Sequence, residues 1–222
     1  MTTDNLRKPV MGRAKSSGRN SASVVIVGGG VIGLSIAREL ALRGRRDIVL
    51  LERGDLGKEA SWAAGGILAP QVEANAADDF FQLARTSRDM YRQFAQALRD
   101  ETGVDIELDQ TGTLYVGFND EDEQEMQRRY DWQTSEGLHV EWLSGDEARL
   151  IEPNLSDEVR CALRFPDDWQ VNNRKLVDAL VASNEKLGVR MMTGCEVTSV
   201  RVDGRTVNGV TARPARLMRV RL

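Results

Sequence analysis

Three glycines and one glutamate near the N-terminus have the spacing of a dinucleotide site. The glycines form the pattern Gly28-x-Gly30-x-x-Gly33, and Glu52 follows nineteen residues after Gly33. In this pattern Gly28 permits a tight turn, Gly30 lets the backbone approach a pyrophosphate, and Gly33 lets a helix pack closely on a strand. The helix N-terminus then offers free N–H groups and the positive end of its dipole to the anion.

The glutamate restricts which dinucleotide fits. The Glu52 carboxylate can accept hydrogen bonds from the ribose hydroxyls of adenosine, and it would repel a phosphate placed there, so an NADP-type 2′-phosphate is disfavoured. With 20 glycines in 222 residues, the glycine triplet alone would be weak evidence, and it does not distinguish FAD from NAD. Its specificity comes from the elements on either side of it.

Those elements predict a β-α-β unit around the motif. Residues 24–27 form a continuous β-branched run, which is typical of a parallel strand covered on both faces. Apolar residues then recur at helical spacing over 34–43, and Gly44 stands where the helix would stop. A second strand over 48–51 ends in Glu52.

The remaining sequence predicts an α+β insert followed by a return to the first pattern. Residues 54–70 are mostly small, so their backbone can approach a ligand closely. Further along the chain we expect a helix over 78–100, two strands within 104–118, a charged helix over 121–135, a strand over 139–143, a helix from Asn172 or Asn173 to 187, a strand over 189–192, and a hairpin of 197–202 with 206–211 around Asp203-Gly204.

Composition excludes several classes of protein. No apolar run approaches the roughly 20 residues that cross a bilayer, and the N-terminus lacks the hydrophobic segment of a signal peptide, so we expect a cytoplasmic protein without a membrane span. Two cysteines, Cys161 and Cys195, are too few for a disulfide framework. The single histidine, His139, makes a histidine-built metal site implausible, so we expect no metal and an ordinary strand role for His139.

Charge is distributed unevenly along the chain. Residues 21–212 carry 21 basic and 33 acidic residues, a formal charge of −12, which disfavours a nucleic-acid partner. Residues 1–21 are rich in basic, serine and glycine residues and are expected to be a flexible leader. Residues 213–222 contain four arginines and no acid, and they form an atypical basic tail.

A family resemblance rests on the two glycine-rich segments. The stretch from Val24 to Glu52, followed by Ala60-Ser61-Trp62-Ala63-Ala64-Gly65-Gly66-Ile67-Leu68-Ala69-Pro70, resembles the FAD-dependent amine oxidases of the D-amino-acid oxidase superfamily. Within that superfamily it is most similar to the glycine oxidases of thiamine biosynthesis. The likeness covers roughly residues 23 to 211 and includes Thr102-Gly103-Val104-Asp105-Ile106, Gln110-Thr111-Gly112-Thr113-Leu114, Phe165-Pro166-Asp167-Asp168 and Gln170-Val171-Asn172.

The resemblance implies a set of FAD contacts and no catalytic residue within this chain. The implied contacts run from the adenine to the flavin ring: Val197 through its backbone at the adenine; Glu52 and Arg53 at the ribose; Gly28, Gly30, Val31, Ile32 and Gly33 at the pyrophosphate; and Ala60, Ser61, Gly65, Gly66 and Ile67 from the pyrophosphate toward the isoalloxazine. A plain loop at residues 60–61 and an ordinary core valine at 197 remain as alternatives.

The implied reaction is oxidative deamination of glycine or a small N-methyl or D-amino acid. A hydride would pass from the α-carbon of the amine to FAD, and oxygen would then accept the electrons and form hydrogen peroxide. In the thiamine route the imine would instead be used to build the thiazole. Alternatives are a catalytically inactive FAD-binding fragment, a D-amino-acid dehydrogenase or a sarcosine oxidase relative. A homo-oligomer of the full-length enzyme is also consistent with the resemblance.

The expected fold class is α/β: a doubly wound FAD-binding (Rossmann-like) domain, 22–77 and 166–212, interrupted by an α+β substrate domain, 78–165, with both domains incomplete. In this family the arginine and tyrosine that grip the substrate carboxylate lie in the C-terminal half, which this sequence lacks. Because residues 213–222 break the preceding pattern, we expect a frameshift or truncation, with a natural short variant as the alternative. Missing strands would leave exposed sheet edges and poor stability.

Overall fold

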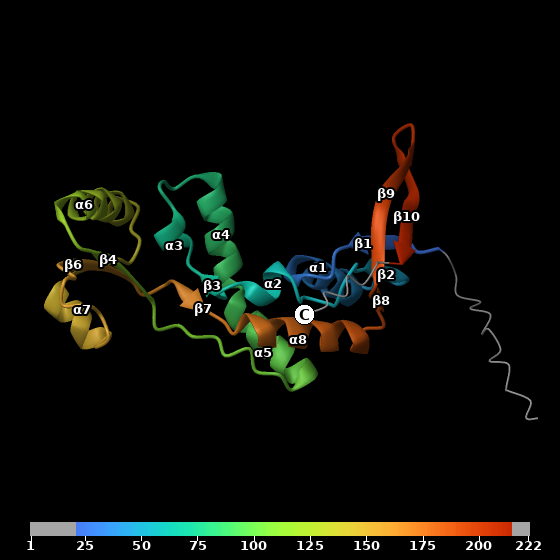
Figure 1. Cartoon of the computed structure of the whole chain (residues 1–222), viewed down its shortest axis with the longest axis horizontal. Coiled ribbons are helices and arrows are strands. Elements are labelled where there is room, and N and C mark those ends of the chain that lie inside the picture. Colours follow the sequence, from blue (N-terminus) through green and yellow to red (C-terminus); the bar gives the residue numbers. More distant parts are fainter. Residues whose placement is uncertain (1–20, 215–222) are drawn as a thin grey trace, which may run out of the picture.

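A three-stranded parallel sheet lies at one end of the molecule, in a computed structural model that describes residues 21–214. The strands are β1 (Val24–Val27), β2 (Ile48–Leu51) and β8 (Arg190–Met192), in the order β1-β2-β8. The two parallel pairings place Leu51 opposite both Val27 and Met192. The sheet thus joins two parts of the chain that are far apart in sequence (Figure 1).

The two faces of this sheet are covered unequally. All four residues of β2 are buried, whereas Val25 and Val27 of β1 are 37% and 56% exposed. The expectation that residues 24–27 form a strand covered on both faces is therefore wrong. The reason is the position of β1 at the edge of the sheet, where one face has no covering layer within the described residues.

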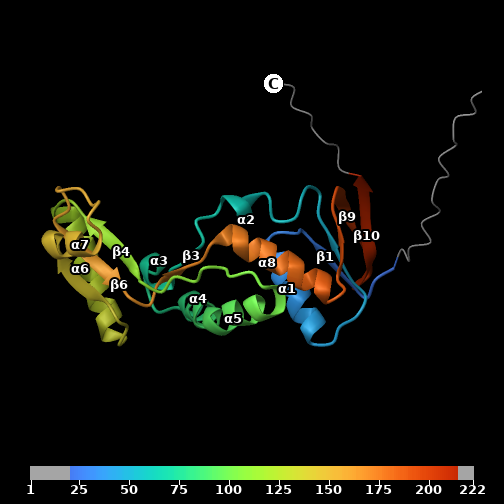
Figure 2. The same cartoon turned by 90° about the horizontal axis from the view of Figure 1, so that it is seen from below.

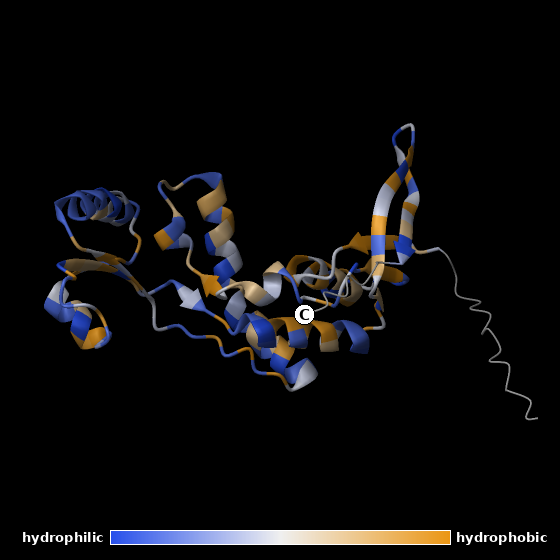
Figure 3. Ribbon diagram, in the orientation of Figure 1, coloured by the Kyte–Doolittle hydropathy of each residue, from blue (hydrophilic) through white to orange (hydrophobic). Residues whose placement is uncertain are grey.

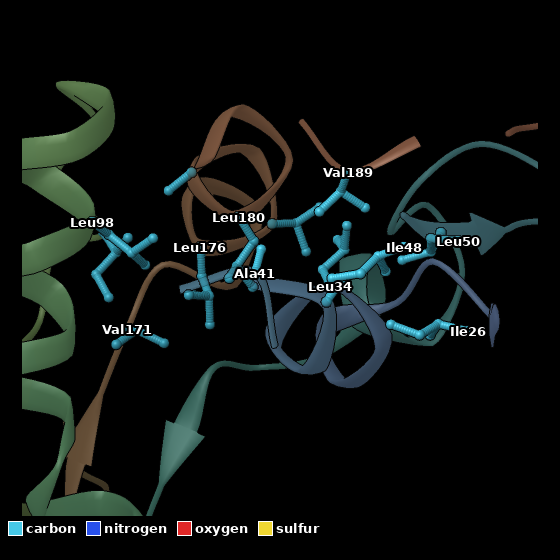
Figure 4. Close-up of a cluster of buried hydrophobic side chains, with 14 residues drawn as sticks. Ile26, Leu34, Ala41, Ile48, Leu50, Leu98, Val171, Leu176, Leu180 and Val189 are labelled. Atoms are coloured by element: carbon cyan, nitrogen blue, oxygen red, sulfur yellow. The ribbon is translucent and has the colours of Figure 1, made fainter. Parts of the chain in front are cut away.

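Three helices build the hydrophobic core beside the sheet: α1 (Val31–Leu42), α8 (Asn173–Lys186) and α5 (Tyr91–Thr102). Figure 4 shows Leu34 of α1, Leu180 of α8 and Leu98 of α5 pointing into one cluster. All three side chains are fully buried, so the cluster excludes water between the helices and the sheet. The larger set that completes the cluster is Ile26, Ala37, Ala41, Ile48, Leu50, Ile106, Val171, Leu176, Val177, Ala179 and Val189.

A partly buried ion pair joins the same three helices. Arg38 of α1 donates to Glu101 of α5, and the Ser183 hydroxyl of α8 donates to Glu101 over 2.7 Å. Burial acts to raise the pKa of Glu101, but the hydrogen bonds from Arg38 and Ser183 outweigh it and hold the pKa below its ordinary value. Glu101 therefore stays ionised and paired within this helix junction.

The opposite end of the molecule is a smaller antiparallel unit. Its sheet has the order β4-β6-β5, formed by β4 (Thr113–Gly117), β5 (Glu141–Ser144) and β6 (Cys161–Phe165), and it is flanked by α6 (Asp120–Ser135) and α7 (Gly145–Ile151). Its core contains Met126, Val140, Cys161, Leu163 and Phe165. In Figure 2 this unit and the parallel sheet lie at opposite ends of an elongated molecule.

Short elements connect the two ends. They are α2 (Ala60–Ala63), β3 (Ile67–Leu68), α3 (Pro70–Glu73), α4 (Asp79–Asp89) and β7 (Trp169–Gln170). β3 pairs with β7 in antiparallel fashion, so the outgoing and returning chains run side by side there. A long hairpin of β9 (Cys195–Asp203) and β10 (Thr206–Pro214) stands away from the parallel sheet, with hydrophilic and hydrophobic residues alternating along it (Figure 3).

Several sequence expectations are confirmed and others are wrong in detail. The helix expected over 34–43 begins earlier, at Val31, and the expected 78–100 helix is broken at Met90 into α4 and α5. Only one strand, 113–117, forms within 104–118. The strand expected over 139–143 begins two residues later, so His139 precedes it, and the ring Nε2 of His139 lies 3.3 Å from Glu141 Oε1.

The predicted hairpin and its turn are confirmed, and β10 extends farther than expected. It continues through Arg213 and Pro214, which pair with Glu196 and Cys195 in the register of the hairpin. The first two residues of the predicted basic tail therefore belong to a strand, and the rest of that tail lies outside the described residues, as does the leader up to residue 20. None of the helices within residues 21–214 combines the length and the hydropathy needed to span a bilayer.

The expected division into domains stays a prediction. Leu98 and Ile106 belong to the segment assigned to the substrate domain, 78–165, yet both are buried in the cluster beside the parallel sheet. The antiparallel unit at the other end begins only at β4. A division that follows the two hydrophobic clusters would therefore place α5 with the parallel sheet.

Truncating Leu180 to alanine is expected to lower the free energy of unfolding by about 2–5 kcal/mol, because the side chain is fully buried among α1, α5 and α8. Leu150→Ala is the matched control, since Leu150 on α7 is 84% exposed and should change stability by no more than about 0.5 kcal/mol. Urea unfolding followed by circular dichroism measures both. Equal effects of the two substitutions would contradict the described core.

Candidate dinucleotide site

The loop between β1 and α1 approaches its own helix closely. Gly28 has a φ of +101°, which favours glycine, and its N–H donates to the Leu51 carbonyl over 2.8 Å. A Cβ added at Gly33 would lie 2.0 Å from the Gly28 carbonyl oxygen. Only glycine fits at this position, because any side chain would push the first turn of α1 away from β1.

A serine from a distant segment lies against the N-terminus of α1. The Val31 N–H donates to Ser61 Oγ over 2.9 Å, and a Cβ at Gly30 would lie 3.0 Å from the same oxygen. Asn173 at the start of α8 donates from Nδ2 to the Ser61 carbonyl over 2.8 Å and so holds α2 in place. The structure thus brings the two glycine-rich segments together at one helix end. Ile32 points outward there and is 74% exposed.

Glu52 is a buried carboxylate at the end of β2. One oxygen, Oε2, accepts a hydrogen bond from the Gly29 N–H over 2.7 Å, and Oε1 accepts one from the Gly54 N–H, also over 2.7 Å. Hydrogen bonds to an ionised acceptor are stronger than neutral ones, so the carboxylate fixes both the glycine-rich loop and the turn that follows β2.

A cleft of about 300 Å³ opens beside this carboxylate. Its lining comes from three separate parts of the chain: Val27, Gly28, Leu51, Glu52, Arg53, Glu59, Cys195, Glu196 and Val197. The predicted residue Val197 thus lies at the same cleft as Glu52, although 144 positions separate them. Three glutamates and one arginine line the cleft, and this excess of negative charge disfavours an added phosphate.

Arg53 forms an ion pair with Glu59, a residue that the sequence motifs did not indicate. Its Nη2 lies 2.6 Å from Glu59 Oε2 and its Nε donates to Oε1 over 3.0 Å, with both side chains largely exposed. The hydrogen bond from Arg53 holds the pKa of Glu59 below its ordinary value. The Arg53 guanidinium therefore lies on Glu59, at the rim of the cleft.

The segment Gly65–Ile67 contacts the returning chain. Gly66 has a φ of +73°, its carbonyl accepts a hydrogen bond from the Val171 N–H over 2.9 Å, and a Cβ there would lie 2.0 Å from the Val171 carbonyl oxygen. Ala60 and Gly65 are exposed, and Ile67 pairs with Gln170 between β3 and β7. These small residues therefore let the backbone of this segment lie directly against the backbone of the returning chain.

A groove of about 490 Å³ begins at Ile67 and runs between α3 and the helices α4 and α5. Pro70 and Glu73 of α3 line one side, and Phe81 and Tyr91 line the other. Ile67, the last residue of the predicted FAD segment, is thus also a lining residue of this groove. No motif or hydrophobic pattern indicated this groove, because tertiary packing alone brings its walls together.

Buried polar side chains hold the α3 wall of the groove by its backbone. Arg129 Nη1 donates to the carbonyls of Val72 and Ala74 over 2.7 and 2.8 Å, and Gln133 Nε2 donates to the Gln71 carbonyl over 3.0 Å. Arg129 and Gln133 lie one turn apart on α6, and with Asp168 they form what we call the α3 clamp. Their four-residue spacing was visible in the sequence, but it did not indicate what they would contact.

Asp168 completes the α3 clamp from the opposite side. Its Oδ1 accepts the Gln71 N–H over 3.1 Å and its Oδ2 accepts the Val72 N–H over 2.9 Å, while Arg88 Nη1 lies 3.9 Å from Oδ1. Burial raises the pKa of Asp168 to about 6, although the two backbone hydrogen bonds and Arg88 act in the opposite direction. The Asp168 carboxyl therefore changes charge near pH 6.

The raised pKa of Asp168 predicts a pH dependence of stability. The folded state binds this proton more tightly than the unfolded state, whose pKa is near 3.8, so the contribution of Asp168 to the free energy of unfolding falls by up to about 3 kcal/mol between pH 4 and pH 6. Asp168→Asn removes this titration. Urea unfolding at several pH values should therefore give a difference, wild type minus variant, that shrinks as the pH rises. A difference independent of pH would contradict the prediction.

These features define a class of protein: an α/β dinucleotide-binding protein with a glycine-rich strand-to-helix turn and an acidic residue after the second parallel strand. The chain belongs to the family described as "DAO: FAD dependent oxidoreductase", which matches residues 23–220. The family is one of flavin-dependent enzymes, and its cofactor is FAD.

Individual relatives agree with this family. The chain is 36% identical over 181 residues to the glycine oxidase of Geobacillus kaustophilus, a match that covers 81% of this chain and 48% of the relative. It is 32% identical to the bifunctional protein ThiO/ThiG of Synechocystis, over 82% of this chain and 26% of the relative. The crystal structure of Bacillus cereus glycine oxidase superposes with a TM-score of 0.79 at 34% identity, over 86% of this chain and 51% of that one. The chain thus spans about half the length of the glycine oxidases it matches.

Proposed function

We propose that this chain binds FAD at the β1–α1 loop and takes part in oxidising the amine of glycine or another small amino acid. The observation that carries the proposal is the buried Glu52 carboxylate, which holds the glycine-rich loop on one side and borders the cleft on the other. The similarity to glycine oxidases supports the substrate class, and the similarity to ThiO/ThiG supports a role in thiamine biosynthesis.

The residues present fit the adenosine and pyrophosphate of FAD. A Cβ at Gly30 would lie beside Ser61 Oγ, so its absence leaves room for phosphate oxygens near the α1 N-terminus. There the Ile32 N–H and the Ser61 hydroxyl, whose oxygen accepts the Val31 N–H, would hold them. The Glu52 carboxylate would accept hydrogen bonds from the ribose hydroxyls, and Arg53 would lie beside the ribose at the rim of the cleft. The backbone of Val197 would meet the adenine, and Gly65 to Ile67, following Ala60, would extend toward the flavin ring.

When bound, FAD supplies the acceptor for a hydride from the α-carbon of the amine. The contribution of this chain is to position the cofactor through the glycine-rich loop and to border the groove that begins at Ile67. The oxidised substrate is an imine, which water converts to an oxo acid and ammonia, and oxygen takes up the two electrons as hydrogen peroxide. We assign no general acid or base in this chain, because a neutral amine can donate a hydride directly.

A second candidate is an FAD-binding chain that is inactive by itself. It is favoured by the uncovered face of β1, beside the cleft, where Val27 is 56% exposed. A D-amino-acid dehydrogenase or a sarcosine oxidase relative would differ in electron acceptor or substrate. The cytoplasmic location and a homo-oligomer remain predictions, which cell fractionation and light scattering check.

The test is to purify the full chain and to titrate it with FAD, following flavin fluorescence and absorbance. Glu52→Gln is expected to weaken FAD binding at least about tenfold, because the amide loses the charge and one acceptor oxygen that fix the loop. Glu121→Gln, an exposed acid on α6, is the matched control and should leave the affinity unchanged. Circular dichroism checks that both variants fold.

Glycine, sarcosine and D-alanine are then compared as substrates by peroxide production. Peroxide formed fastest from glycine supports the first candidate. FAD binding without turnover of any of the three amines supports the second. A chain that shows no flavin binding, although folded, would exclude both.

A further inference from the structure

Helix α2 carries Ser61, yet the hydrophobic core does not hold this helix. None of its four residues is buried, and a single helical turn is not stable in water by itself. Its position must therefore come from contacts outside the core. Figure 2 shows α2 beside the start of α8, and there Asn173 donates from Nδ2 to the carbonyls of Ser61 and Trp62 over 2.8 and 3.0 Å.

The indole ring of Trp62 makes a second set of contacts. The Lys58 ammonium nitrogen lies 3.0 Å from the centroid of this ring, and the Arg174 guanidinium carbon lies 5.1 Å from it. The negative face of an aromatic ring attracts such cations. Lys58 belongs to the loop before α2 and Arg174 to the first turn of α8, so the ring joins α2 to two neighbouring segments.

The contacts of this ring bear on the position of the preceding side chain, Ser61. Its Oγ accepts the Val31 N–H over 2.9 Å, at the end of α1 where the pyrophosphate would bind. The same hydroxyl can donate its own proton to an anion. A displacement of α2 would take this donor away from α1, and no buried residue of α2 would resist the displacement.

We propose that Trp62 is a positioning residue for FAD, which through Lys58 and Arg174 fixes α2 so that Ser61 stays at the pyrophosphate position. This role rests on the proposed function and adds to it a residue that acts through Ser61. Without the ring, α2 also occupies positions in which the hydroxyl lies away from α1. The apparent affinity for FAD then falls in proportion to the fraction of molecules that keep α2 in place.

The positioning itself is tested in the full chain without FAD, by hydrogen exchange of the Val31 amide measured by NMR. Trp62→Leu keeps an apolar side chain and removes the aromatic face, so this exchange should become at least about fivefold faster. Trp62→Phe keeps an aromatic face and should change the rate less than about twofold. Trp142→Leu, the same substitution on β5 in the antiparallel unit, is the matched control and should leave the rate unchanged. An unchanged rate in Trp62→Leu overturns the proposal.

The effect on the cofactor is tested by FAD titration of the same variants together with Ser61→Ala. Trp62→Leu is expected to weaken binding at least about fivefold, and Trp62→Phe less than about twofold. Because Trp62 acts through Ser61, the double variant should bind FAD no more weakly than Ser61→Ala alone. Additive effects of the two substitutions contradict this expectation and overturn the proposal.

Two further measurements separate the remaining explanations. If Lys58→Met and Arg174→Met weaken FAD binding more than Trp62→Leu does, the cations act directly on the charge of the pyrophosphate, and the positioning role of the ring is overturned. Urea unfolding of Trp62→Leu should be nearly unchanged, because no residue of α2 is buried. A wild-type chain that binds no FAD overturns the proposed function and with it this role at the cofactor, whereas exchange of the Val31 amide still shows whether Trp62 holds Ser61 in place.

Discussion

The pairing of β2 with strands on both of its sides constrains the rest of the molecule. β1 reaches it from the neighbouring sequence, whereas β8 reaches it only after the chain has formed all the elements from α2 to α8. Residues 52–189 must therefore leave the sheet and return to it. The segment that leaves the sheet and the segment that returns to it lie side by side where β3 pairs with β7. The antiparallel unit lies between them in sequence and forms the opposite end of the molecule.

The same constraint produces the candidate site. The Glu52 N–H donates to the Met192 carbonyl and the Glu52 carbonyl accepts from the Cys195 N–H, each over 2.8 Å, so the backbone on both sides of this residue is tied to the returning chain. Val197 follows two residues later and reaches the cleft as a consequence. The glycine-rich loop, the Glu52 carboxylate and the hairpin thus meet where the returning chain joins the sheet, and a ligand in the cleft would contact segments from both ends of the described sequence.

Features that depend on local sequence could be predicted, and features that depend on distant packing could not. The Gly28–Gly33 turn, the Asn172 cap of α8 and the Asp203-Gly204 hairpin each follow from a few adjacent residues. The break at Met90 and the single strand within 104–118 depend on which segments pack nearby, and the hydrophobic pattern alone carried no such information. The family resemblance pointed to Gly28, Glu52, Arg53 and Val197, which line the cleft, but not to the Arg53–Glu59 ion pair, because a motif specifies residue types and not the contacts of their side chains.

The α3 clamp fixes the position of the α3 wall of the groove through its backbone and leaves the side chains on the groove side of α3 out of its contacts. Arg129, Gln133 and Asp168 hold mainly backbone carbonyl and N–H groups of α3, which every residue type except proline provides. The side chains of Glu73 and Ala74, which face the groove, take no part in these contacts. Substitution at these two positions would therefore alter the shape or charge of the groove wall while the hydrogen bonds that hold the α3 backbone remain.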